Sequence, residues 1–416
     1  MTASSAARTG EPAVALPVLP LRRNRDFRLM WIGHATSELG TSISVLVMPL
    51  LVLTLSGSAA LAGLLGTVGF ATSWLATLPG GYVADMFDRR RVMLICDAGR
   101  AVLVGLTALA VFTEMAPAPA LVVVVGATTC MAASFGAAEI QAVRIIVPIE
   151  QIPDAVGINQ ARGYAIGMVG PLMAGWLLAV NNALPLGVDA VTYLVSLVCV
   201  WSLRTTLAPE NRPQVRRLLP DIGAGWTTVW RHPFMRALTT YAVVVNFAGS
   251  MLLYVLILGS GGKVLIGAGI SLAAAAGLAG SLVAPAVSRR VPTRALVVGT
   301  ELVRVASLVA VTLTGSAVGL VFVLAAAMLL SPIVGASLTS TKMRLVPGEI
   351  LGRVNGASMF MSTALQPLAP LCAGLLVEYA SRTVAQLVLV GAFGAVAVLC
   401  AVVPGFGARA TANPPS

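Results

Sequence analysis

The sequence of 416 residues is 57% hydrophobic and only 10% charged, and its formal net charge is +11. Soluble domains contain roughly 25% charged residues, so this chain has too few charges to cover a water-soluble protein of its size. The composition excludes a soluble enzyme, and we expect a lipid bilayer to surround most of the surface.

Apolar runs long enough to cross a bilayer, about 20 residues each, recur along almost the whole chain. They predict an all-α integral membrane protein with twelve transmembrane helices. We expect six-helix bundles at 27–204 and 237–404, a polar connector at 205–236, and polar tails at 1–26 and 405–416. The helices are expected at 27–55, 60–83, 91–113, 117–138, 155–180, 184–204, 237–258, 264–287, 294–314, 316–338, 353–379 and 383–404.

The basic residues of the predicted loops fall almost entirely on one side of the membrane. One set of alternate loops contains most of the arginines, whereas the other contains only Lys263 and Arg382. Positive charge collects on the cytoplasmic side of membrane proteins. We therefore expect a multi-pass protein of the bacterial plasma membrane with both termini in the cytoplasm. Topology accounts for the net charge, so no nucleic-acid partner is expected.

The remaining composition contains no sign of a metal or cofactor. The five cysteines are scattered through apolar runs, without a CxxC motif or a Cys/His cluster, so neither a metal site nor a disulfide framework is indicated. The phosphate-binding pattern GxxxxGK[ST] is also missing, which argues against a pump that is itself driven by ATP. The N-terminus lacks the pattern of a removable signal peptide.

The second half of the sequence resembles the first. The segment 147–150 (Val-Pro-Ile-Glu) corresponds to 346–349 (Val-Pro-Gly-Glu), and 171–175 corresponds to 370–374, both at an offset of 199. Such repeats predict two pseudo-symmetric six-helix bundles, the layout of a transporter that rocks around a site between its halves. A third match pairs Asp97 and Arg100 with Glu301 and Arg304.

Several segments resemble the major facilitator superfamily. Residues 80–91 (GGYVADMFDRRR) are similar to its loop between helices two and three, and residues 24–33 to the entry of its first helix. Gly170-Pro171 with Ala174-Gly175 resembles the fifth-helix motif of antiporters, and residues 353–356 resemble the start of helix eleven. The resemblance covers residues 22–404 and is to the twelve-helix drug-efflux branch, which includes enterobactin exporters and macrolide efflux proteins.

This resemblance implies the major facilitator fold and secondary active export of a small amphiphilic compound in exchange for protons. A monomer is expected. Met86 stands where the loop motif usually has a basic residue, and Asp88 where many members have glycine. The predicted fourth helix contains no arginine, so the arginine-based coupling route of many drug–proton antiporters is not expected.

Glu38 is the candidate for proton coupling or substrate binding. It lies in the first predicted helix four residues after His34, so both side chains share one helix face. Ionisable groups inside a membrane are costly and are functional candidates by default, and histidine titrates near physiological pH. The alternative is a polar pair that only binds neighbouring helices.

Other charged residues have structural or gating interpretations. The pairs Asp97–Arg100 and Glu301–Arg304 are expected to form ion pairs within their helices, because an unpaired buried charge costs several kcal/mol. Arg162, near the start of the fifth helix, is expected to snorkel toward the membrane surface.

The resemblance also implies a cytoplasmic gate. Asp85 would contact Arg353 and the N-terminus of the eleventh helix. Arg89 and Arg90 accompany Asp85 in the same loop, and Glu139, at the expected end of the fourth helix, would join this network. These contacts would break when the cytoplasmic side opens.

Gly170, Pro171 and Gly175 in the fifth helix allow two interpretations. Small residues permit close helix packing, whereas the antiporter resemblance favours a hinge or a seal against proton leak.

Two functional classes besides drug export remain open. Within the transporters, the alternative is a dedicated exporter of one metabolite, such as a siderophore or antibiotic. Outside them, an integral-membrane enzyme would need a cluster of acids, histidines or hydroxyls, and the chain has only two histidines. A non-transporting membrane scaffold is the third reading, which the intramembrane acids disfavour.

Overall fold

The computed structural model of the protein describes residues 21–208, 230, 233–259, 262–345 and 348–402. Twelve helical segments of this part are long and apolar enough to cross a membrane, which confirms the predicted all-α membrane fold. Its α-helices are α1 (Arg25–Ser56), α2 (Ala59–Met86), α3 (Arg89–Phe112), α4 (Ala118–Ile146), α5 (Ile152–Val180), α6 (Leu184–Trp201), α8 (Pro233–Gly259), α9 (Lys263–Arg290), α10 (Thr293–Thr314), α11 (Ala317–Leu345), α12 (Gly348–Thr363), α13 (Leu368–Tyr379) and α14 (Arg382–Val402); short 3-10 helices cover Leu21–Arg23 and Ile149–Gln151.

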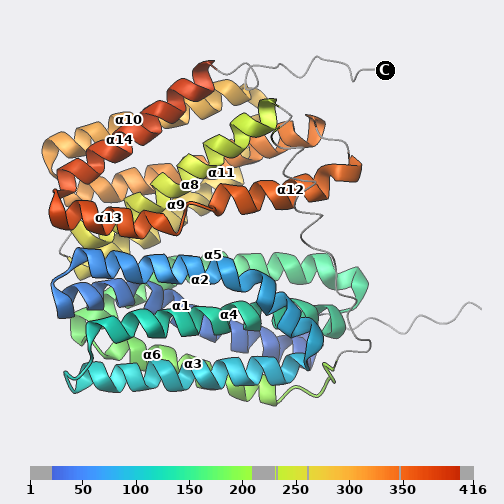
Figure 1. The fold of residues 1–416 in the computed structure, drawn as a ribbon. Coiled ribbons are helices and arrows are strands. Elements are labelled where there is room, and N and C mark those ends of the chain that lie inside the picture. The colour runs from blue at the N-terminus through green and yellow to red at the C-terminus, as the bar shows by residue number, and fades with distance from the viewer. Residues whose placement is uncertain (1–20, 209–229, 231–232, 260–261, 346–347, 403–416) are drawn as a thin grey trace, which may run out of the picture.

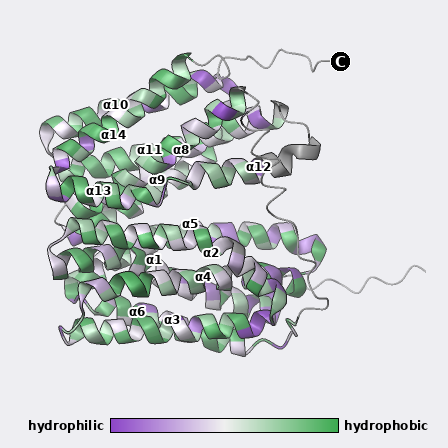
Figure 2. Ribbon diagram, in the orientation of Figure 1, coloured by the Kyte–Doolittle hydropathy of each residue, from purple (hydrophilic) through white to green (hydrophobic). Residues whose placement is uncertain are grey.

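The helices form two bundles, α1–α6 in one and α8–α14 in the other (Figure 1). Hydrophobic residues cover most of the length of the helices, and hydrophilic residues gather toward the end where α2 meets α3 (Figure 2). We call this end, at residues 86–89, the arginine-rich end. The opposite end, where α1 meets α2 at residues 56–59, is called the charge-poor end.

Local sequence signals fix several helix ends. The side chains of Asn24, Ser58 and Asp88 cap α1, α2 and α3, because each accepts a hydrogen bond from a main-chain N–H group in the first turn. Gly57 follows α1 with a φ of 68°, a left-handed conformation that glycine adopts without steric cost. These signals allow the sharp reversal between α1 and α2.

The predicted helix at 353–379 is interrupted. The structure divides it into α12 and α13, with turns at residues 364–367. Pro367 and Pro370 lack the N–H groups that would continue the helical hydrogen bonds. Asn246 compensates locally by donating to the Ser362 carbonyl at 3.1 Å, and the Gln366 side chain donates to Ser250 Oγ at 2.9 Å.

Several other predicted boundaries differ from the structure; the tenth predicted helix, for example, continues past 338 to Leu345 in α11. The fourth helix, expected to end at 138, continues to Ile146, and the fifth begins at Ile152 rather than at 155. The fourth helix therefore does contain an arginine, the exposed Arg144 in its last turn. Most of the predicted connector and of both predicted tails lies outside the described residues, and the helix α8 already begins at Pro233.

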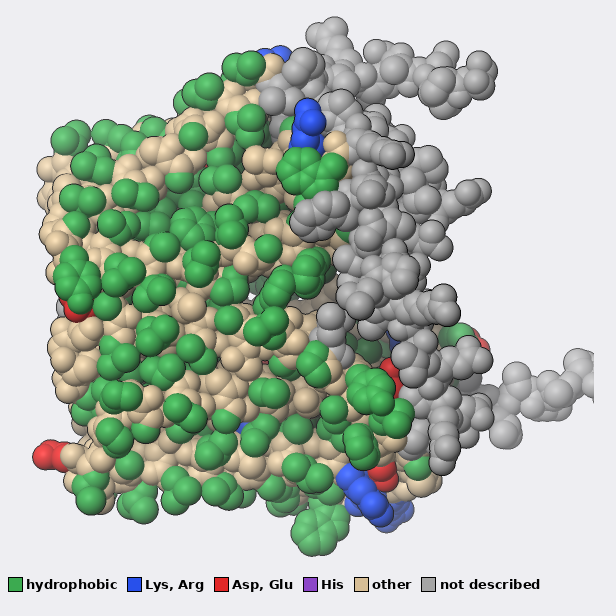
Figure 3. Space-filling view, in the orientation of Figure 1, with side chains coloured by type: hydrophobic (Ala, Val, Ile, Leu, Met, Phe, Trp, Pro, Cys, Tyr) green, Lys and Arg blue, Asp and Glu red, His purple; other side chains and the backbone are tan. Residues whose placement is uncertain are grey.

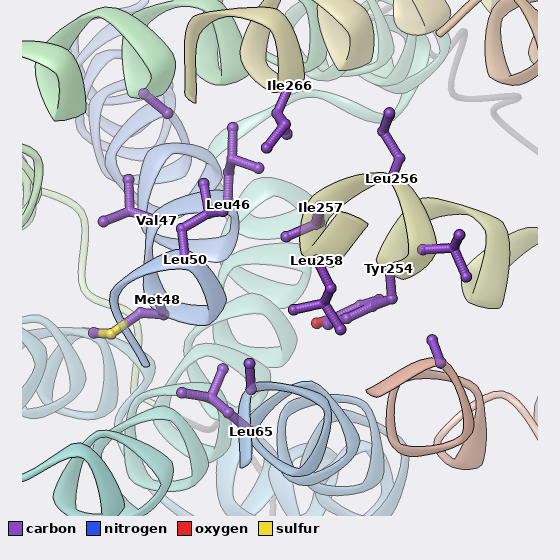
Figure 4. Packing of buried hydrophobic residues seen from close by; sticks show 14 of the residues in the cluster. Leu46, Val47, Met48, Leu50, Leu65, Tyr254, Leu256, Ile257, Leu258 and Ile266 are labelled. Carbon is purple, nitrogen blue, oxygen red and sulfur yellow. The ribbon is translucent and has the colours of Figure 1, made fainter. Parts of the chain in front are cut away.

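The largest cluster of buried hydrophobic residues draws on both bundles. Leu46 and Leu50 of α1 and Leu65 of α2 belong to the same cluster as Ile257 and Leu258 near the end of α8 (Figure 4). These residues lie in the half of the molecule near the charge-poor end. Burial of apolar side chains from both bundles holds the bundles together there.

The buried hydrophobic residues near the arginine-rich end form two separate clusters. One includes Phe27 and Met93 and belongs to α1–α6 and the adjoining segments, whereas the other includes Phe234, Val297 and Cys400 and belongs to α8–α14. The space-filling view shows the surface hollowed between the two bundles (Figure 3). Among the described residues, the bundles thus share a hydrophobic core at one end only.

Candidate functional site

Four ionisable side chains from three helices meet in the N-terminal bundle. His34 and Glu38 come from α1, Glu139 from α4 and Arg162 from α5. His34 Nδ1 lies 2.5 Å from Glu139 Oε1, and Arg162 Nε donates to Glu38 Oε2 at 3.0 Å. Arg162 Nη1 is 3.7 Å from Glu139 Oε1, and His34 Nε2 is 3.9 Å from Glu38 Oε2. We call these four residues the α1–α4–α5 cluster.

Burial differs across the α1–α4–α5 cluster. The side chains of Glu139 and Arg162 are 9% and 8% exposed, whereas those of His34 and Glu38 are 18% and 34% exposed. Two carboxylates therefore face one guanidinium and one imidazole, with Glu38 at the accessible edge. A buried charge is tolerated when partners of opposite sign surround it, and here the carboxylates are in excess unless His34 is protonated.

Packing holds the members of this cluster in position. Phe135 of α4 presents its ring edge-on to His34, with the ring centres 5.6 Å apart. Asn159, one turn before Arg162 on α5, accepts from Arg162 Nη1 at 3.4 Å. Gly163 of α5 packs beside Glu38, whose Oε1 lies at van der Waals distance, 3.8 Å, from the place a Cβ would occupy.

The structure corrects two sequence-based placements. Glu139 does not lie beside the Asp85 loop; it points to His34, because α4 continues past residue 138 and places Glu139 two turns before its end. Arg162 does not extend away from the bundle: its side chain is only 8% exposed and contacts both carboxylates. A lone arginine within an apolar run was a signal that a partner is required.

The repeated acid–arginine pairs occupy equivalent places in the two bundles. Arg100 Nη2 donates to Asp97 Oδ1 at 2.5 Å, and Arg304 Nη1 donates to Glu301 Oε1 at 2.8 Å. All four side chains are at most 5% exposed. Each arginine also lies over aromatic rings: Arg100 over Phe135 and Tyr193, and Arg304 over Phe393. Such cation–π contacts add to the stability of a desolvated guanidinium.

Asp189 of α6 is also fully buried. It accepts hydrogen bonds from Ser44 of α1 and from Thr192, and the adjacent Tyr193 hydroxyl lies 2.9 Å from Thr41 Oγ1. These bonds satisfy the carboxyl group and tie α6 to α1.

Two seams join the bundles near the charge-poor end, α2 against α13 and α5 against α9. At Gly63 of α2, an added methyl group would overlap the carbonyl oxygen of Pro370, and at Gly267 of α9 it would overlap that of Pro171. Gly175, from the antiporter-like motif, packs against Gly267 in the second seam. The two seams thus use the repeated segments 171–175 and 370–374 in the same way. Gly170 faces Ser42 of α1 instead.

Polar contacts close the outer edge of both seams. Glu378 Oε2 on α13 accepts from Ser58 Oγ at 2.7 Å and from the main-chain N–H of Ala60 at 2.6 Å. Lys263 Nζ at the start of α9 donates to Asn182 Oδ1 at 2.9 Å. Each contact joins one bundle to the other across the charge-poor end.

Comparison with known proteins identifies the family. Residues 30–370 match the family model described as Major Facilitator Superfamily. The chain belongs to the Major Facilitator Superfamily. It is therefore a multi-pass membrane protein of a transporter family, and the predicted family is confirmed.

Curated relatives of this superfamily member include efflux proteins. The chain is 26% identical over 208 residues to the multidrug efflux pump Tap of Mycobacterium tuberculosis and of Mycobacterium bovis. The match covers 48% of this chain and 49% of the relative, so the chain spans about half the length of the curated relatives it matches.

Solved structures of transporters share the superfamily fold. The chain superposes on a bacterial homologue of the iron transporter ferroportin, in an inward-facing state, with a TM-score of 0.68 at 15% identity, covering 94% of this chain and 100% of that one. The nucleoside transporter NupG gives a TM-score of 0.70 at 13% identity, with coverage of 93% and 100%. A bacterial homologue of the human lysosomal transporter Spinster gives a TM-score of 0.66 at 17% identity, covering 93% of this chain and 96% of that one.

The superfamily-like loop between α2 and α3 contacts its own bundle. Asp85 is exposed and accepts from Gln141 of α4 at 2.5 Å, while Arg89 donates to Gln141 at 2.9 Å and to the Leu207 carbonyl at 3.3 Å. Arg90 donates to the main-chain carbonyl of Trp201. The side chain of Arg353 lies outside the described part of the structure, so its expected contact with Asp85 stays a prediction.

The described residues contain no group of three or more His, Cys, Asp and Glu side chains that is placed to hold a metal ion.

Proposed function

We propose that this transporter is a secondary active exporter that moves a small amphiphilic compound out of the cell by proton antiport with alternating access. One observation carries the proposal: the bundles share a hydrophobic core and two seams at the charge-poor end, but have separate cores at the arginine-rich end. This asymmetry is what one state of a rocking transporter requires.

The proposed orientation follows from charge. Arginine-rich loops stay in the cytoplasm of bacterial membranes, so the arginine-rich end faces the cytoplasm and both termini lie there. We infer from this orientation a state that opens inward and is sealed toward the outside. The protein would lie in the plasma membrane and act as a monomer, with each chain containing its own pair of bundles.

The α1–α4–α5 cluster supports the proposed coupling. With His34 neutral, two carboxylates face a single guanidinium, and either a proton or a cationic group of the exported compound would balance the second negative charge. The two ligands would therefore compete for one site, which is the physical basis of exchange. Glu38, at the accessible edge, would be the first group that a compound entering between the bundles meets.

The name of the mycobacterial relatives supports the choice of substrate class, since those proteins are multidrug efflux pumps. A susceptibility panel in an efflux-deficient bacterial host tests this choice. Expression is expected to raise the inhibitory concentration of several chemically distinct amphiphilic drugs. An increase for one metabolite alone would indicate a dedicated exporter, and no increase for any compound would contradict drug export.

Proteoliposomes test the exchange itself. A compound identified by the panel, added on the side from which it is bound, should cause proton movement in the opposite direction. Transport of the compound without any proton movement would contradict antiport while leaving export intact.

A further inference from the structure

A cavity of about 450 Å³ lies on the N-terminal bundle at the arginine-rich end, away from the seams between the bundles. It is lined by Asp88, Arg90 and Arg91 at the start of α3, by Leu94 one turn later, and by Trp201 at the end of α6. Neither the α1–α4–α5 cluster nor the seams include these residues.

The charge of this cavity is positive. Arg90 and Arg91 both contribute guanidinium groups, whereas Asp88 supplies one carboxylate. Asp88 already caps α3, because its Oδ1 accepts the main-chain N–H of Arg90 at 2.9 Å. Arg90 donates one bond to the Trp201 carbonyl, but a guanidinium has five N–H donors. The cavity therefore presents donors and net positive charge suited to a phosphate group.

An apolar surface continues from the cavity along the outside of the bundle. Trp201 is 67% exposed, and Val198 on the same helix is 60% exposed. On the neighbouring α3, Ile95 and Val102 are 70% and 59% exposed. Because α3 and α6 pack against each other, we infer that these exposed side chains form one lipid-facing surface that begins beside the arginines. Tryptophan is also common at the level of lipid headgroups.

We propose that this cavity is a binding site for an anionic phospholipid. Arg90 and Arg91 hold the phosphodiester of the headgroup, and an acyl chain lies along the exposed faces of α3 and α6. Basic pockets between transmembrane helices bind anionic headgroups in this manner. The net positive charge selects phosphatidylglycerol over the zwitterionic phosphatidylcholine. The proposal is independent of the exported compound.

Native mass spectrometry of the full-length protein in detergent tests this site with defined lipids. Phosphatidylglycerol is expected to remain bound at concentrations where phosphatidylcholine does not. Arg91→Gln should lower the affinity for phosphatidylglycerol about fivefold, and Arg90→Gln/Arg91→Gln should lower it about 30-fold. Each arginine near a lipid surface contributes about 1 kcal/mol to the binding free energy. Arg91→Gln alters an exposed side chain, so of these two variants it is the one that should disturb folding least.

The matched control is Arg289→Gln/Arg290→Gln, which removes an exposed arginine pair from the corresponding end of α9. This control variant should retain as much tightly bound phosphatidylglycerol as the wild type. Inorganic phosphate at millimolar concentration should not displace the lipid; displacement would mean that the site binds free phosphate and would overturn the acyl-chain contact. Equal retention of the two lipids, or an equal loss in the control variant, would overturn the proposal.

Discussion

The N-terminal and C-terminal bundles repeat the same pattern but differ in their interior charges. Both contain a buried acid–arginine pair on equivalent helices, Asp97–Arg100 in α3 and Glu301–Arg304 in α10, with the arginine packed on an aromatic ring. The N-terminal bundle adds the α1–α4–α5 cluster. Among the described ion pairs, the C-terminal bundle has no counterpart to it.

This difference separates two tasks. A feature that occurs in both bundles serves a need that both share, and for a pair buried between helices that need is stability. A feature found in one bundle only is suited to a step that takes place once in each proposed transport cycle. We therefore propose that the repeated pairs serve stability and that the α1–α4–α5 cluster serves the exchange of substrate and proton.

The largest expected effects come from breaking the repeated pairs. Arg100→Met and Arg304→Met each leave a buried carboxylate without its partner, which costs about 3–5 kcal/mol. Both variants should lower the thermal unfolding temperature in mild detergent by similar amounts. The double variant Asp97→Leu/Arg100→Met removes both charges and should recover much of the loss. An unchanged unfolding temperature in either single variant would contradict the assignment to stability.

The seams give the next largest effect. Gly63→Ala and Gly267→Ala place a methyl group against a carbonyl oxygen of the other bundle, and such overpacking costs about 1–3 kcal/mol. The sealed charge-poor end should open more often, and cysteines introduced there should react faster. Gly391→Ala is the control, because nothing lies near its Cβ position. Equal reaction rates in all three variants would show that the seams do not set the conformational balance.

Glu139→Gln tests the α1–α4–α5 cluster directly. It removes the negative charge beside His34 and leaves Arg162 with Glu38 as its carboxylate partner. Export of a compound from the susceptibility panel should fall about tenfold or more. A tenfold change corresponds to a free energy of about 1.4 kcal/mol. Glu114→Gln, an exposed residue at the charge-poor end, should export normally. Full export by Glu139→Gln would remove this cluster from the mechanism.

A smaller and more specific effect is expected for Glu38→Gln. Glu38 is the more exposed carboxylate, and it would exchange protons with the space between the bundles. The rate of export should depend less on pH in this variant than in the wild type, with Glu114→Gln again serving as control. An unaltered pH profile would exclude Glu38 from proton coupling.

The sequence allowed the number of spans and their repetition to be predicted, because apolar length and internal similarity are local features. It placed His34 beside Glu38 from helical spacing alone. It missed the contacts of Glu139 and Arg162 with His34 and Glu38, since these contacts depend on how α4 and α5 pack against α1. The break between α12 and α13 was also missed, although Pro367 and Pro370 were local signals for it.

We propose that the two ends of the molecule open alternately. Spin-label distances across the bundles, in a variant without native cysteines, test this proposal. One label pair replaces Thr113 and Thr314 at the charge-poor end, and another replaces Arg91 and Arg290 at the arginine-rich end; all four side chains are exposed.

Distances are compared at neutral and acidic pH, with and without an exported compound. We expect conditions that lengthen the first distance to shorten the second. Two distances that change in the same direction, or that both stay fixed during transport, would contradict alternating access by these bundles.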